Sequence, residues 1–178
     1  MLPRLRIVFL LALPLAAQTP KPDSVAISFG PTWRMVSRQF VSLAEAMPAD
    51  KYAFKPTAGA FDGARSFGEQ VKHVACANYG FFNEIEGKEP PANCATGGPN
   101  PAKTKDELVK YLRDSFDYAE RILSTVDAKT MLDRVTGPYG APNTRLGVMT
   151  VAVWHASDHY GQLVEYARLC GIVPPASR

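Results

Sequence analysis

Apolar residues recur at intervals of three and four positions in four long stretches of the chain, and this spacing predicts amphipathic α-helices. The first stripe runs from Phe29 to Met47, and Pro48 ends it. The second helix begins with a capping box at residues 66–69 and ends at Gly87. The first half of the chain is therefore expected to form two helices.

Two further helices are predicted in the second half. A capping box at residues 104–107 opens the third, whose apolar stripe runs from Leu108 to Val126. The fourth covers residues 146–170 and ends at Gly171. The sequence shows no convincing period-two alternation and no internal repeat. The pattern predicts an all-α fold, with one domain built as a four-helix bundle.

Proline and glycine gather between the predicted helices. Residues 52–63 have no helical period and are predicted to be a connection, and residues 134–145 form a second irregular stretch. Residues 88–103 are rich in proline, glycine and asparagine. A loop of this length could let the chain cross the bundle instead of forming a tight hairpin.

The N-terminus has the layout of a secretory signal peptide. Arg4 and Arg6 precede an apolar run at residues 7–15, and the small residues Ala16 and Ala17 follow. The alternative, an N-terminal anchor, is disfavoured because spanning a bilayer of about 30 Å takes about 20 apolar residues. We expect a periplasmic or secreted protein with a cleaved signal peptide at residues 1–17, a flexible tail at 18–27 and the helical domain at 28–178.

The net charge of the chain limits the kinds of binding partner that the sequence predicts. The formal net charge is +3, and loss of Arg4 and Arg6 with the signal peptide would reduce it to +1. A nearly neutral chain without a basic stripe gives nucleic-acid binding no electrostatic support. No second apolar span follows the signal, so we expect no membrane association after cleavage. Roughly 160 residues would remain, enough for one domain with a sizeable core.

Export also affects the three cysteines, because disulfides persist in an oxidising compartment. Cys76 lies one turn after His73, and Cys94 lies in the long loop that follows the same helix. A bridge between them would fix that loop and leave Cys170 free. The alternative is that Cys76 and Cys170 are small core residues, and the sequence leaves both open.

The three histidines all fall within predicted helices. His155 and His159 are one turn apart, so both rings leave the same face of the fourth helix. His73, in the second helix, shares its face with Gln70. Three imidazoles on facing helices could hold a transition metal and leave one coordination position open. The alternative is a set of core histidines that bond to one another and to Gln162. The predicted inward stripe of the fourth helix is Val148, Ala152, His155, His159, Gln162, Tyr166 and Leu169.

Several segments resemble the DinB/YfiT-like superfamily of bacterial metal-binding four-helix bundles. They are YAFKP at residues 52–56, SFGEQVKHVA at 66–75, HASDHYGQLVEYAR at 155–168 and GIVPP at 171–175. The resemblance implies a divalent metal held by His73, His155 and His159. Some relatives are thiol transferases or isomerases, and relatives often pair, so a homodimer is an open alternative. A signal peptide departs from the cytoplasmic norm and makes reliance on a cytoplasmic thiol less expected.

Three nitrogen ligands suit zinc, nickel, iron or cobalt, with zinc as the first choice. A metal-bound water would then be the reactive group. No side chain is an obvious general base. Glu69 is better explained by the capping box, and Asp158 either orients an imidazole or is a solvated charge. Gln70 and Gln162 are expected to line the pocket, while Tyr160 and Tyr166 are expected to pack.

Three hypotheses follow for the function. The first is an exported metal-dependent enzyme that hydrolyses an unidentified small molecule or transfers a group, such as a thiol, to it. The second is a non-catalytic metal-binding or sensing bundle. The third is a purely structural bundle whose histidines are hydrogen-bonded. The sequence does not identify a substrate or a catalytic residue beyond the three candidate ligands.

Overall fold

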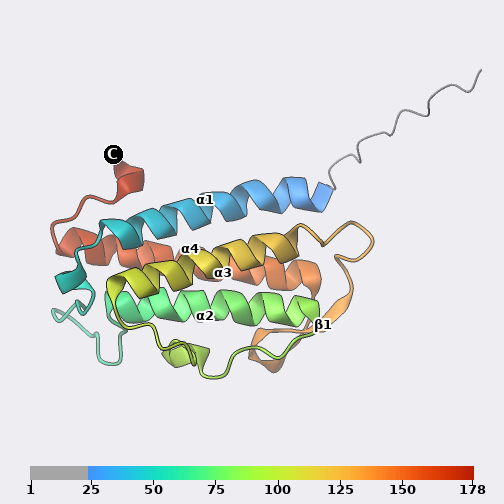
Figure 1. The fold of residues 1–178 in the computed structure, drawn as a ribbon, viewed down its shortest axis with the longest axis horizontal. Coiled ribbons are helices and arrows are strands. Elements are labelled where there is room, and N and C mark those ends of the chain that lie inside the picture. Colours follow the sequence, from blue (N-terminus) through green and yellow to red (C-terminus); the bar gives the residue numbers. More distant parts are fainter. Residues whose placement is uncertain (1–23) are drawn as a thin grey trace, which may run out of the picture.

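The computed structural model describes residues 24–178, which form four long helices lying side by side (Figure 1). The predicted all-α four-helix bundle is confirmed. The predicted signal peptide and residues 18–23 of the predicted tail lie outside the described residues. The helices are α1 (Ser24–Ala46), α2 (Phe67–Glu86), α3 (Lys105–Leu123) and α4 (Arg145–Leu169).

Both predicted capping boxes are present. The Ser66 hydroxyl accepts a hydrogen bond from the Glu69 backbone N–H, and the Glu69 carboxylate accepts one from the Ser66 N–H. Thr104 and Glu107 make the same exchange at the start of α3. Gly87 ends α2 in the left-handed conformation, at φ 71°. These local signals explain why the predicted ends of α2 agree with the structure.

The start of α1 corrects the predicted tail. The helix begins at Ser24, so residues 24–27 are helical although they were predicted as the end of a flexible segment. Pro31 lies inside α1 and cannot donate a helical hydrogen bond. Val25 is nevertheless buried in the core, and its packing favours the helical start. Tertiary contact here outweighs the local signal.

A small hairpin corrects the predicted irregular stretch at residues 134–145. Strands β1 (Arg134–Thr136) and β2 (Pro142–Thr144) pair antiparallel, with Val135 opposite Asn143. Each strand has only three residues, too few for alternation to be recognised in the sequence. The described residues also form single-turn 3₁₀ helices at Ala49–Lys51, Cys94–Thr96, Pro138–Gly140 and Pro175–Ser177.

The long segment after α2 crosses the bundle, as the sequence allowed. It runs back along the whole bundle before α3 begins (Figure 1). Helices α2 and α3 are therefore parallel, and hydrogen bonds join Asn78 to Ser115 and Asn83 to Tyr118 in matching order. Helix α4 returns antiparallel to α2. Helix α2 thus packs against α3 and α4, and so does α1.

An aromatic cluster forms the centre of the core. Trp33 packs against Phe82 and Phe116, with ring centroids 5.3 and 5.0 Å apart, and Phe40 packs against Phe116 at 6.1 Å. None of these four side chains is more than 1% exposed. The hydrophobic core around this cluster contains residues of all four helices. Among the described residues, no helix has the length and apolar character that crossing a membrane requires.

Candidate metal centre

The three histidines meet at the seam between α2 and α4. Because the two helices are antiparallel, residue 73 faces residues 155–159. One candidate ligand atom from each ring lies within 4.8 Å of the other two. The Nε2 atoms of His73 and His155 are 3.1 Å apart. His155 and His159 are only 6% and 8% exposed, so the cluster lies largely inside the bundle.

Hydrogen bonds set the orientation of two of the rings. The Nδ1 of His73 is 2.5 Å from the Cys94 carbonyl oxygen, and the Nδ1 of His159 is 2.9 Å from the Gln70 Oε1 atom. Both oxygens only accept, so Nδ1 is the donor in each ring. In a neutral imidazole the other nitrogen, Nε2, then carries the free lone pair. Both rings are thus prepared to bind a metal through Nε2.

The His155 ring differs from the other two. Its Nδ1 is buried and has no hydrogen-bond partner among the described residues. The ring packs edge-on against Phe81, with centroids 5.3 Å apart. Without a metal, His155 Nε2 donates to the free lone pair of His73 Nε2. With the proton on Nδ1 instead, His155 Nε2 becomes the third free nitrogen of the cluster.

Burial keeps the cluster uncharged. Desolvation is the main cause that lowers the pKa of His155 to about 3 and that of His159 to about 4, and repulsion from neighbouring rings adds to it. Desolvation also lowers the pKa of His73, against a smaller opposing effect of the Cys94 carbonyl. All three rings are therefore neutral near pH 7, which is the form that binds metal. Donor set, orientation and protonation all fit a divalent transition metal.

The structure corrects part of the predicted α4 stripe. Gln162 is exposed and donates to the Asp158 carboxylate at 2.8 Å instead of lining the histidine site. Leu169 is 64% exposed, whereas Leu163 is fully buried. The predicted stripe has an average spacing of 3.5 residues, while an α-helix has 3.6 residues per turn. The stripe consequently drifts about 20° per heptad, which brings Gln162 and Leu169 out of the core.

Other predicted roles are resolved by contacts. Gln70 lines the site, as expected, and binds His159. Glu69 serves the capping box, and its hydrogen bond to the Ser66 backbone lowers the pKa of its carboxyl. Tyr160 packs against Phe40, and the Tyr166 hydroxyl donates to the Arg65 carbonyl. None of these contacts supplies a general base to the histidines.

Two groups at the site were not predicted. The Cys94 carbonyl is a backbone atom in a loop, so no side-chain pattern could mark it. Arg65 donates from Nε and Nη2 to the Ala95 carbonyl at 3.0 and 2.6 Å. With Lys55, it lines a cavity of about 400 Å³ next to this loop. The charge of Arg65 contributes slightly to the lowered pKa of all three histidines.

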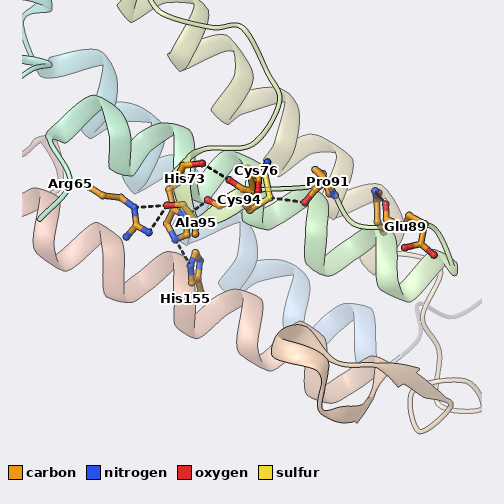
Figure 2. The surroundings of a disulfide bond; sticks show 11 residues. Arg65, His73, Cys76, Glu89, Pro91, Cys94, Ala95 and His155 are labelled. Atoms are coloured by element: carbon orange, nitrogen blue, oxygen red, sulfur yellow. Dashed lines mark hydrogen bonds between the residues drawn. A yellow bond between two sulfur atoms is a disulfide. The ribbon is translucent and has the colours of Figure 1, made fainter. Parts of the chain in front are cut away.

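The disulfide between Cys76 and Cys94 is present and confirms the bridged alternative (Figure 2). It ties the crossing segment to α2, with 5.2 Å between the two Cα atoms. Cys170 is free. The same residue, Cys94, thus supplies one sulfur to the bridge and one carbonyl to His73.

Comparison with known proteins gives a family match and similar folds. The sequence profile of the DinB superfamily matches residues 32–163. The crystal structure of a DinB-like protein from Bacillus subtilis is similar at a TM-score of 0.62 and 22% identity, over 81% of this chain and 92% of that one. A conserved protein from Enterococcus faecalis has a TM-score of 0.62 at 18% identity, over 82% and 96%. At these identities the structural likeness concerns the fold. A comparison with curated proteins gives no significant match.

Proposed function

Because the chain belongs to the DinB superfamily, we propose that it binds a divalent transition metal through His73, His155 and His159. One observation supports this above all: three neutral imidazoles converge, and two of them have their Nδ1 donor already occupied. Zinc is the preferred metal, with nickel, iron and cobalt as alternatives. The Gln70 side chain and the Cys94 carbonyl would hold the rings in their ligating orientation.

The reaction we propose is hydrolysis or group transfer, including transfer to or from a thiol, on a small molecule. When bound, the metal supplies Lewis-acid chemistry. The protein itself contributes the buried environment that keeps the imidazoles neutral. The charge of Arg65 acts on the histidines, and Arg65 lines a cavity with Lys55 and Glu69, so these two cations favour a substrate with negative charge.

A non-catalytic metal-binding or structural bundle is the second candidate. It is favoured by the contacts of the nearest carboxylates: Glu69 is held in its capping box, and Asp158 pairs with exposed Gln162. In a catalytic site, the general base would then have to be a group bound to the metal or a group of the substrate. The two candidates differ in whether one coordination position is open to exchange.

Export and self-association are further parts of the proposal. Residues 1–17 have the pattern of a signal peptide, and the Cys76–Cys94 bridge is typical of an oxidising compartment. We place the protein in the periplasm or outside the cell on these two grounds. A homodimer stays a prediction from the family resemblance.

The first experiment is elemental mass spectrometry on untagged protein purified from its native compartment. Wild type is compared with His155→Ala and with Gln162→Ala, a control on the exposed face of the same helix. The proposal expects a near-stoichiometric transition metal in wild type and control, and its loss in His155→Ala. Absence of metal from all three proteins would favour the structural bundle.

A second experiment separates an open site from a closed one. The protein is loaded with Co²⁺, whose visible spectrum depends on its coordination, and azide is added. A spectral change in wild type indicates an exchangeable position and supports the enzyme. An unchanged spectrum at saturating azide would support the non-catalytic bundle.

A further inference from the structure

The disulfide and a candidate metal ligand are coupled through one short piece of backbone. Cys76 follows His73 by three residues on α2, so both face the crossing segment. The bridge from Cys76 reaches Cys94, and the carbonyl of Cys94 accepts the Nδ1 hydrogen of His73 at 2.5 Å (Figure 2). The disulfide and the hydrogen bond therefore both join α2 to Cys94, one through its sulfur and the other through its backbone carbonyl.

The segment around Cys94 packs closely against α2. Gly98 has φ +73°, and a Cβ atom there would lie 2.2 Å from the Cys76 sulfur. Only glycine fits this close approach. The Asn93 carbonyl accepts from the backbone N–H groups of Thr96 and Gly98, which closes the turn. A tight turn of this kind transmits the position of the sulfur to the adjacent carbonyl.

Outside this turn the crossing segment has little structure of its own. Between α2 and α3 the structure contains only the single-turn helix Cys94–Thr96. Hydrogen bonds also tie the turn to the bundle: the part-buried His73 bond itself and the exposed Arg65 bonds to the Ala95 carbonyl. The disulfide is the one covalent anchor among the described residues of the segment.

We infer that the Cys76–Cys94 disulfide controls the metal affinity of the histidine cluster by holding the Cys94 carbonyl against His73. This inference rests on the proposed metal binding. A dithiol that delivers two electrons and two protons would convert the bridge to two thiols and would itself become a disulfide. The carbonyl then loses its fixed position, and the His73 ring loses its orientation. Loss of such an outer partner typically lowers metal affinity about 10- to 100-fold.

The test compares Zn²⁺ affinity with and without the bridge, by competition with a chromophoric chelator. The Cys76→Ala/Cys94→Ala double variant removes both sulfurs, so that no thiolate can bind the metal. Its Kd for Zn²⁺ is expected to rise at least about 10-fold. Cys170→Ala, which removes the free cysteine, is the matched control and leaves the Kd unchanged. Equal Kd values in the double variant and the wild type would overturn the inference while leaving the proposed function intact.

Reduced wild type is measured in parallel with a phosphine reductant, which takes up oxygen from water as the two thiols form. We expect reduced wild type to lose as much Zn²⁺ affinity as the double variant. Tighter Zn²⁺ binding after reduction would contradict it, because the freed thiols would then act as ligands. Should the double variant not fold, Gly98→Ala displaces the same turn without removing a cysteine, and the Kd is expected to rise.

A spectroscopic readout distinguishes a specific effect from general loosening. In the metal-free protein, the Nδ1–H signals of His73 and His159 are followed by ¹⁵N-edited NMR. The double variant is expected to lose the protected His73 signal and to keep that of His159, whose acceptor is Gln70. Retention of both signals would overturn the coupling even if no metal binds. Failure of oxidised wild type to bind any metal would instead refute the proposed function.

Discussion

Two of the interfaces between helices, α1 on α3 and α2 on α4, are built from different chemistry. Where α1 packs on α3, Trp33, Phe40 and Phe116 fill the contact and are at most 1% exposed. The one polar atom of that cluster, the Trp33 Nε1, donates to the Phe116 carbonyl at 3.2 Å. Where α2 packs on α4, Gln70, His155 and His159 occupy positions of similar burial, at 2%, 6% and 8% exposure.

The two seams are expected to contribute differently to the stability of the fold. The aromatic seam gains free energy from burial alone. The histidine seam buries polar rings and leaves His155 Nδ1 without a partner in the described part of the chain. An unpaired buried polar group costs about 1–3 kcal/mol. Under the proposed function, metal binding offsets that cost.

The largest effect on stability is expected at the aromatic seam. Trp33→Ala should lower the free energy of unfolding by about 3–5 kcal/mol, because it removes the largest side chain from a closed core. The measurement is urea denaturation of the metal-free protein. Trp154→Ala is a matched control, since Trp154 is 60% exposed and its loss should cost less than about 0.5 kcal/mol. Similar losses in both variants would contradict the comparison.

The histidine seam should respond to metal instead. Zn²⁺ at about 1,000 times its Kd should stabilise the wild type by about 4 kcal/mol and should not stabilise His155→Leu. Without metal, His155→Leu should be about as stable as the wild type, because the lost hydrogen bond from His155 Nε2 to His73 is offset by removal of the buried Nδ1, which has no partner among the described residues. Thermal unfolding with and without Zn²⁺ measures both effects. Marked destabilisation of the metal-free variant would mean that the histidines contribute to the fold.

Acid should also act on the histidine seam. The pKa of His155 is lowered to about 3 and that of His159 to about 4, against about 6.5 in the unfolded chain. Below pH 6.5 the unfolded chain therefore binds more protons than the native protein. The stability of the metal-free protein should fall as pH decreases from about 6.5 toward 4, by at most about 1.4 kcal/mol per pH unit for each ring.

The pH effect is checked by urea denaturation of the metal-free protein across that range. The His155→Leu/His159→Leu double variant provides the control, since it lacks both groups. Its stability should depend less steeply on pH than that of the wild type. Parallel profiles for the two proteins would show that other groups control the acid sensitivity.

The smallest effects are expected from substitutions of Gln70 and Asp158, two of the polar side chains that were predicted near the histidines. Gln70→Leu should raise the Kd for Zn²⁺ about 10- to 100-fold, because His159 loses the acceptor for its Nδ1 hydrogen. Asp158→Asn should raise the Kd less than Gln70→Leu does, because that carboxylate is hydrogen-bonded to exposed Gln162 and reaches His159 through its charge. Chelator competition measures both. Equal effects of the two changes would mean that charge near the metal matters more than ring orientation.

The elements that depend on local chemistry could be predicted from the amino-acid sequence. Helical spacing and the capping residues Ser66, Thr104 and Gly87 specify α2 and the start of α3, because each acts within one turn of chain. The i, i+4 spacing of His155 and His159 likewise specifies a shared face. The inward face of the second helix already suggested His73 as the third member of the cluster, and the family resemblance implied the same three ligands.

The remaining features could not be predicted, because they depend on contacts between residues far apart in the chain. The Cys94 carbonyl reaches His73 across 21 residues, and the Gln70 amide reaches His159 across 89. No local pattern encodes either approach. The packing of α4 on the core turned Gln162 outward and Leu163 inward, where a small error in helical period decides the outcome. The histidines could be proposed from the sequence, whereas the groups that orient them required the fold.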